Sequence, residues 1–124
     1  AGVHAIAMDL RNLGSGSLDV RLAADGAGGR FATTAAISLA GLGSWTSAIL
    51  PIGAGDWTAV GGTDVNATLA SLSQLRVLSA ATPAWQGDRL AGELHVDNIR
   101  AVPEPATLYL LALAGLSGLW FLRR

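Results

Sequence analysis

The chain has 124 residues, of which 51% are hydrophobic and 14% charged, and its formal net charge is −1. That length suits one modest domain, and a nearly neutral chain with so few charges is not expected to bind nucleic acid. The sequence holds no cysteine, which excludes disulfide frameworks, thiolate zinc sites, iron–sulfur clusters and cysteine nucleophiles.

The N-terminal end shows no charged segment followed by an apolar run. The first residue is Ala1 rather than methionine. Such a start fits either the interior of a longer protein or the product of leader removal. Both origins stay open for the folded part, residues 1–101, and a first strand missing from the chain would leave its fold incomplete.

Short runs of alternating apolar and polar residues recur over residues 1 to 102, and clusters rich in glycine, aspartate and asparagine separate them. Period-two alternation is typical of strands with one buried face, and such clusters are typical of turns. The first strand, for example, puts Met8 on the buried face and Asp9 on the opposite one, and the second separates Val20 from Arg21 in the same way. Strands are expected at 3–11, 17–24, 33–40, 44–50, 74–80 and 92–101.

Two stretches between these strands have other patterns. Residues 25–29 and 53–56 are glycine-rich and are expected to be turns or loops. Residues 64–74 favour one or two helical turns, with a crossing loop as the alternative, because three leucines have helical spacing: Leu69, Leu72 and Leu75. Short strands joined by glycine-rich turns predict a mainly β fold, an antiparallel β-sandwich or jelly roll.

The C-terminal end carries an uncharged apolar run at residues 106–122. As a helix this run would be roughly 25 Å long, near the lower limit for crossing a bilayer. Arg123 and Arg124 follow it at once, and the positive-inside rule keeps them in the cytoplasm, so that the folded part lies outside. A single transmembrane helix is therefore predicted, with a buried core helix as the weaker alternative.

The residues just before this run carry a family resemblance. The order Val102-Pro103-Glu104-Pro105, then the apolar run, then Arg123-Arg124 resembles the PEP-CTERM sorting signal of Gram-negative bacteria, here residues 102–124. Prolines fix φ and lack an N–H donor, so this segment is expected to stay extended, outside the helix.

The resemblance implies an exported protein held in the inner membrane until an exosortase, an integral membrane enzyme, processes it. It makes Pro103, Glu104 and Pro105 recognition residues, and it implies a final place at the cell surface or in the extracellular polysaccharide and biofilm matrix. The physical logic parallels lipid anchoring, in which a terminal apolar tail is discarded after recognition. A permanently tail-anchored protein is the alternative.

The folded part resembles the carbohydrate-binding-module-like sandwiches common in PEP-CTERM proteins. The resemblance rests on residues 75–78, on Gly87-Asp88, and on the run 92–99 that ends in Asp97-Asn98-Ile99. It makes binding of extracellular polysaccharide the alternative function. Indole rings stack on the C–H faces of sugars, and the candidates are Trp45, Trp57 and Trp85, with Trp57 preferred because it lies in a glycine-rich stretch. Core packing, rather than stacking, is the favoured role for Trp45, and this preference can extend to all three.

The remaining polar residues do not predict an enzyme. No Gly-x-Ser-x-Gly motif occurs, and two histidines, His4 and His95, are too few for a three-histidine zinc site. The resemblance offers Asp97 as a weak candidate ligand for structural Ca²⁺. The favoured alternative is that Asp97 bonds the backbone where the last strand bends. No other cofactor is expected.

Overall fold

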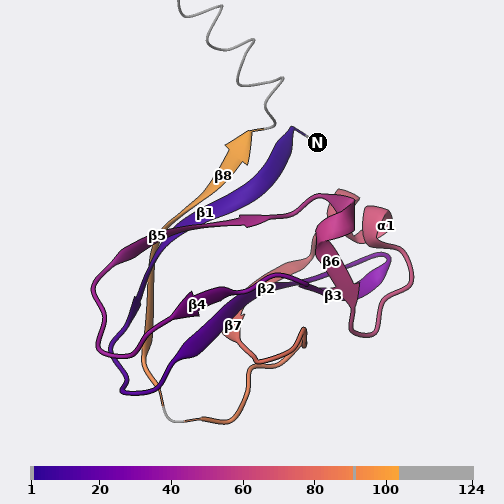
Figure 1. Ribbon diagram of the computed structural model, residues 1–124. Helices are drawn as coiled ribbons and strands as arrows, with labels where there is room; N and C mark the ends of the chain where they lie inside the picture. Colours follow the sequence, from indigo (N-terminus) through magenta and orange to yellow (C-terminus); the bar gives the residue numbers. More distant parts are fainter. Residues whose placement is uncertain (1, 91, 104–124) are drawn as a thin grey trace, which may run out of the picture.

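A computed structural model describes residues 2–90 and 92–103 and shows a mainly β fold built from two antiparallel sheets (Figure 1). One sheet has the strand order β5-β1-β8. The other has the order β4-β2-β3-β6, and β7, off this path, also pairs with β2. A 3-10 helix, η1 (Ala54–Asp56), and a short helix, α1 (Val65–Ala70), complete the described part. The strands are β1 (Val3–Asn12), β2 (Leu18–Gly26), β3 (Gly29–Thr33), β4 (Ile37–Leu39), β5 (Thr46–Pro51), β6 (Trp57–Ala59), β7 (Gln74–Ser79) and β8 (Leu94–Pro103).

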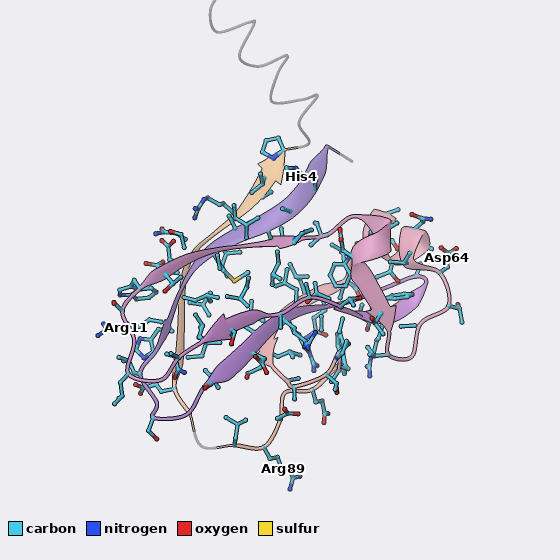
Figure 2. All side chains as sticks on the ribbon, in the orientation of Figure 1. His4, Arg11, Asp64 and Arg89 are labelled. Atoms are coloured by element: carbon cyan, nitrogen blue, oxygen red, sulfur yellow. The ribbon has the colours of Figure 1, made fainter. Side chains whose placement is uncertain are left out.

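The main hydrophobic core lies between the two sheets, where Figure 2 shows side chains of both layers meeting. Each contributing strand sends alternate side chains inward, because successive side chains of a strand point to opposite faces. This confirms the buried faces predicted for the first two strands. The core comprises Ile6, Met8 and Leu10 of β1, Leu18, Val20 and Leu22 of β2, Leu39 of β4, and Ala48 and Leu50 of β5.

Two predicted elements differ from the structure. The strand expected at 33–40 is interrupted at 34–36 by a bend, so Thr33 ends β3 and Ile37 begins β4. β2 pairs with β3 through residues 23–26 and with β4 through residues 18–20. The one or two helical turns expected within residues 64–74 are confirmed as α1. This helix ends at Ala70, however, so Leu72 and Leu75 do not share its face. Leu75 instead lies on β7 and is 40% exposed.

A second, smaller hydrophobic cluster covers the outer face of the five-stranded sheet. Its buried members are Ala23, Ala32, Leu78 and Ala80, and Trp85 of the following loop packs against them. The face that carries Arg21, expected to be polar, is therefore partly covered, and Arg21 is only 7% exposed. Its guanidinium donates to four backbone carbonyls, those of Thr33, Thr34, Ala80 and Ala81.

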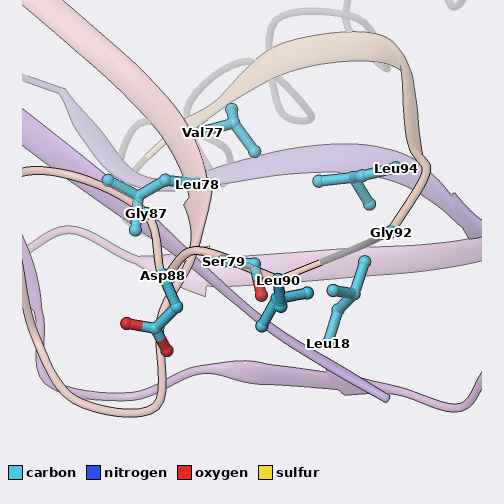
Figure 3. A pocket seen from close by; sticks show the side chains of 9 residues that line it. All are labelled: Leu18, Val77, Leu78, Ser79, Gly87, Asp88, Leu90, Gly92 and Leu94. Atoms are coloured by element: carbon cyan, nitrogen blue, oxygen red, sulfur yellow. The ribbon is translucent and has the colours of Figure 1, made fainter. Parts of the chain in front are cut away.

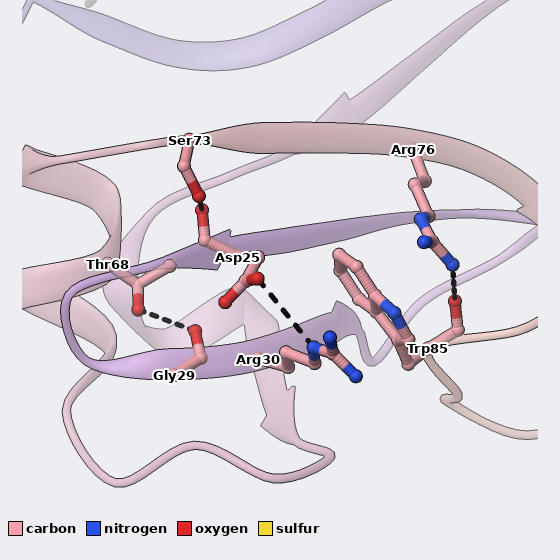
Figure 4. Close-up of polar contacts among 7 residues, drawn as sticks. All are labelled: Asp25, Gly29, Arg30, Thr68, Ser73, Arg76 and Trp85. Carbon is pink, nitrogen blue, oxygen red and sulfur yellow. Dashed lines mark hydrogen bonds and ion pairs between the residues drawn. The ribbon is translucent and has the colours of Figure 1, made fainter.

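Helix α1 is fastened to the β2–β3 hairpin. Asp64 begins the helix, its carboxylate accepting the backbone N–H of Ala67, as an N-cap residue does. The hydroxyl of Thr68, fully buried, donates to the carbonyl of Gly29 over 2.7 Å (Figure 4). The helix is short but has a fixed position, because the hairpin holds it through a buried side chain.

The predicted membrane span, 106–122, lies outside the described residues. Within residues 2–90 and 92–103, no helix is long and apolar enough to cross a membrane.

Candidate functional site

The predicted sorting motif begins where the three-stranded sheet ends. Pro103 is the last residue of β8 and pairs with Val3 at the start of β1, so it is extended, as its fixed φ favours. Figure 1 shows β8 ending beside the N-terminal end of β1. The other predicted sorting residues, Glu104, Pro105, Arg123 and Arg124, lie outside the described part of the chain.

A β-bulge interrupts β8 just before the motif. Asp97 pairs with Asp9 and Arg100 pairs with Ala7, so three steps along β8 match two along β1. Asn98 lies in the bulge with a positive φ of 52°, a conformation that asparagine tolerates better than most residues. Three hydrogen bonds fix it: Asn98 donates its side-chain amide to Asp9 over 2.7 Å and its backbone N–H to Asp97, and its carbonyl accepts from Arg100.

This bulge also sets the electrostatics of Asp9. The hydrogen bond from Asn98 lowers the pKa of the Asp9 carboxyl below its usual value, and desolvation acts in the opposite direction. The hydroxyl of Ser47, which donates over 3.1 Å, and the charge of Arg100 lower the pKa further. The carboxylate form is therefore the one that holds the bulge.

The weak calcium candidate, Asp97, lies in this same bulge. Its carboxylate accepts the backbone N–H of Asn98 over 2.8 Å, which is the backbone role that the sequence favoured. Among the described residues, no three histidine, aspartate or glutamate side chains gather as a metal site would require.

The two histidines lie far apart along the β1–β8 pair. The strands are neighbours, but they run antiparallel, so His95 pairs with Arg11 while His4 lies at the opposite end of β1. His4 occupies a second irregularity of the pairing, between Val3 and Ala5, and its Nδ1 is buried without a hydrogen-bond partner among the described residues. The fold therefore does not bring His4 and His95 to one place.

The preferred stacking candidate, Trp57, is a structural residue. It lies on strand β6 rather than in a loop, packs against the main core, and donates its indole N–H to the carbonyl of Ile52 over 3.2 Å. The prediction of a loop position was wrong because the preceding glycine-rich stretch forms η1 and then enters the sheet.

The indole ring of Trp85 contacts the guanidinium groups of two arginines. The guanidinium carbons of Arg76 and Arg30 lie 4.0 and 4.6 Å from its ring centroid, and Figure 4 shows the indole between them. Arg76 also donates to the backbone carbonyl of Trp85, and Arg30 lies 3.7 Å from the carboxylate of Asp25. These contacts hold the loop against the outer face of the sheet through cation–π stacking, so the ring is not free for a sugar.

Trp45, for which core packing was expected, is the exposed member of the three, at 47%. The alternation along β5 could have revealed this, because Ala48 and Leu50 point inward and the odd-numbered positions point out. Its indole meets the ring of His95 edge-on at 6.4 Å, and His95 lies 3.5 Å from the carboxylate of Glu93. With Arg11 opposite His95 in the register, these residues put hydrogen-bonding groups beside an open aromatic face; we call this set, Arg11, Trp45, Glu93 and His95, the Trp45 surface.

Two of the hollows in the described part border β8. One of about 270 Å³ lies beside β7 and the start of β8 and is lined mainly by leucines and glycines (Figure 3). Asp88, its one titratable lining residue, accepts the backbone N–H of Ala81. The other, about 520 Å³, opens where β1 and β8 reach the sorting motif and is lined by apolar residues such as Val3, Ile52 and Leu72, with Asn66. The lining of neither hollow offers a pair of titratable side chains.

A comparison with protein families matches residues 101–124 to the PEP-CTERM protein-sorting motif. No curated protein and no solved structure matches the chain. The match confirms the predicted sorting motif and supports an exosortase as the processing partner, with export and processing at a membrane. The resemblance of residues 1–101 to carbohydrate-binding modules stays a prediction.

Proposed function

We propose that this protein is an exported surface or matrix protein of a Gram-negative bacterium, released from the inner membrane by an exosortase. In this proposal the run 106–122 holds the precursor in the membrane and Arg123-Arg124 stops its transfer. The chain itself catalyses no reaction; it is the substrate of one. The observation that carries the proposal is the match at 101–124, which begins in the last strand of the β domain.

The position of the motif supports this order of events. Strand β8 ends at Pro103, and in the sequence Glu104 and Pro105 separate it from the apolar run. A cut there would free the β domain with all of its described strands, since these lie before it. The tail would stay behind in the bilayer, as in other signals in which a terminal apolar segment is discarded.

Replacing Glu104 and Pro105 with alanine is expected to abolish processing, because recognition of a charged group between two prolines is lost. The measurement is the intact mass of the protein recovered from its own host: the wild type loses the residues after the Pro-Glu-Pro region, and the variant retains Leu108–Arg124. The matched control is Glu93→Ala, an exposed glutamate outside the motif, which leaves processing unchanged. A wild-type protein that keeps the apolar run would instead be a permanent tail-anchored protein.

A second candidate function, binding of extracellular polysaccharide, is favoured by the exposed indole of Trp45. An aromatic face bordered by an imidazole, a carboxylate and a guanidinium can stack on a sugar ring and bond its hydroxyls. Trp57 and Trp85 are engaged by the fold, so the Trp45 surface replaces them as the proposed stacking site.

Truncation of Trp45 to alanine is expected to weaken retention on a polysaccharide array by about tenfold or more, as the loss of a central aromatic contact does in other binding sites. Ile49→Ala is the matched control, since Ile49 is 58% exposed on the same strand region and lies outside the Trp45 surface. Equal retention of the Trp45 variant and the wild type would rule out this site.

A further inference from the structure

The sorting motif and the β domain share residues. The match covers 101–124, and residues 101–103 are also the end of β8, where Val102 pairs with Ala5 of β1. A cleft that binds an extended chain does so largely through backbone hydrogen bonds, and β1 already occupies one side of this backbone. The sheet and the processing enzyme therefore compete for the same segment.

The pairing of β8 with β1 is divided into two halves by the bulge at Asn98. The anchored half, Leu94–Asp97, pairs with the end of β1, and the terminal half, Arg100–Pro103, pairs with its start. The terminal half is itself irregular, since the register shifts again between Val3 and Ala5. Its last residue is a proline, which has no N–H to donate.

The two halves differ in their contacts with the main core. In the anchored half, Leu94 and Val96 pack against the main core. In the terminal half, Arg100 and Ala101 are exposed. Val102 and Pro103 are half-buried like Leu94 and Val96, but they are not among the residues that pack against the main core, and Ala101 borders the open apolar hollow of about 520 Å³. Segments with few buried apolar contacts open at the lowest free energy, so the terminal half is the part of β8 that separates most easily.

The short distance between Pro103 and the predicted membrane span explains why this separation would help processing. The predicted span begins at residue 106, three residues after Pro103, and three residues reach at most about 10 Å. Detaching the terminal half adds four residues, or roughly 13 Å of reach. This added length of extended chain gives an enzyme room to bind residues 103–105 while the folded domain stays close to the bilayer.

We propose that Arg100–Pro103 is a detachable part of the recognition segment, which leaves β1 when the membrane enzyme binds the sorting motif as an extended chain. The bulge, fixed by Asn98 and Asp9, is the point at which the separation stops, so the rest of the domain stays folded. The inference rests on the proposed function, since it requires processing by such an enzyme.

A disulfide across the terminal half tests it. The natural chain has no cysteine, and Ala5 and Val102 are direct partners, so their Cα atoms have the separation of an antiparallel pair, which a disulfide can bridge. In the host, the oxidised variant Ala5→Cys/Val102→Cys is expected to convert from precursor to mature form at a rate at least about tenfold below that of the wild type. The reason is that the binding-competent state is no longer populated. Reductant restores the wild-type rate.

The matched control places the same bond in the anchored half, with Leu10→Cys/Val96→Cys, since Leu10 and Val96 are also direct partners and lie outside the Trp45 surface. This variant is expected to be processed at the wild-type rate, and its export and protease resistance show that a β1–β8 bond leaves the fold intact. Processing of the oxidised Ala5–Val102 variant at the wild-type rate would overturn the inference alone. A wild-type chain that is never processed would instead overturn the proposed function, and the inference with it.

Discussion

Replacing Arg21 with methionine is expected to lower the free energy of unfolding by about 3–5 kcal/mol, as breaking a buried charged network does. The guanidinium donates to the carbonyls of Thr33, Thr34, Ala80 and Ala81 over 2.6 to 3.0 Å. These carbonyls lie where β3 and β7 end, so one side chain of β2 satisfies both strand ends. Methionine keeps much of the apolar stem but leaves the four acceptors without their donor.

A loss of this size is a large share of the stability of a small domain, which is about 5–15 kcal/mol. Thermal unfolding of the full chain in detergent, followed by circular dichroism, is expected to show a decrease of Tm of about 12 °C or more. The Tm of Arg21→Lys should lie between those of the wild type and Arg21→Met, because one ammonium group cannot reach four carbonyls. The matched control is Arg89→Met, an exposed arginine that points away from the sheets in Figure 2; if both variants unfold alike, Arg21 has no special structural role.

Arg21 also shows where prediction from the sequence reaches its limit. Alternation correctly placed it on the face of β2 opposite Val20, and such faces are usually solvated. The face is covered because the loop after β7, about 60 residues further along the chain, folds back over it and brings Trp85. No local pattern around Arg21 carries that information, since it depends on a contact between distant segments.

The candidate functional residues show the same contrast between local sequence patterns and contacts between distant segments. The sorting motif is a run of neighbouring residues, so its proline, charge and hydropathy pattern could be read directly, and the family match agrees. The surroundings of the tryptophans depend on the register of whole strands: Trp57, the preferred stacking candidate, packs against the main core, and Trp45 is exposed. The overlap of the motif with β8 could not be seen either, because it requires the pairing of the two ends of the chain.

Replacing Gly28 with alanine is the second substitution with a large expected effect, a loss of about 3 kcal/mol or more of the free energy of unfolding, at the upper end for overpacked sites. An added Cβ would lie 1.7 Å from the carbonyl oxygen of Asp64 and 2.7 Å from its carbonyl carbon. Both atoms are backbone, and they cannot move freely, because Asp64 begins α1 and the carbonyl of Gly28 accepts the backbone N–H of Thr63 over 2.8 Å. The turn and the loop before α1 would have to separate.

The sequence predicted a turn at residues 25–29, but the need for glycine at position 28 comes from the approach of this distant loop. Gly16→Ala is the matched control: Gly16 also lies in a turn between strands, and a Cβ there meets no atom within 4 Å. Alanine at that position is expected to leave stability unchanged or to raise it by up to about 1 kcal/mol, because the unfolded chain loses conformational freedom. Urea unfolding of the two variants separates the explanations, since a general intolerance of alanine in turns would destabilise both equally, whereas a steric clash with Asp64 destabilises the Gly28 variant alone.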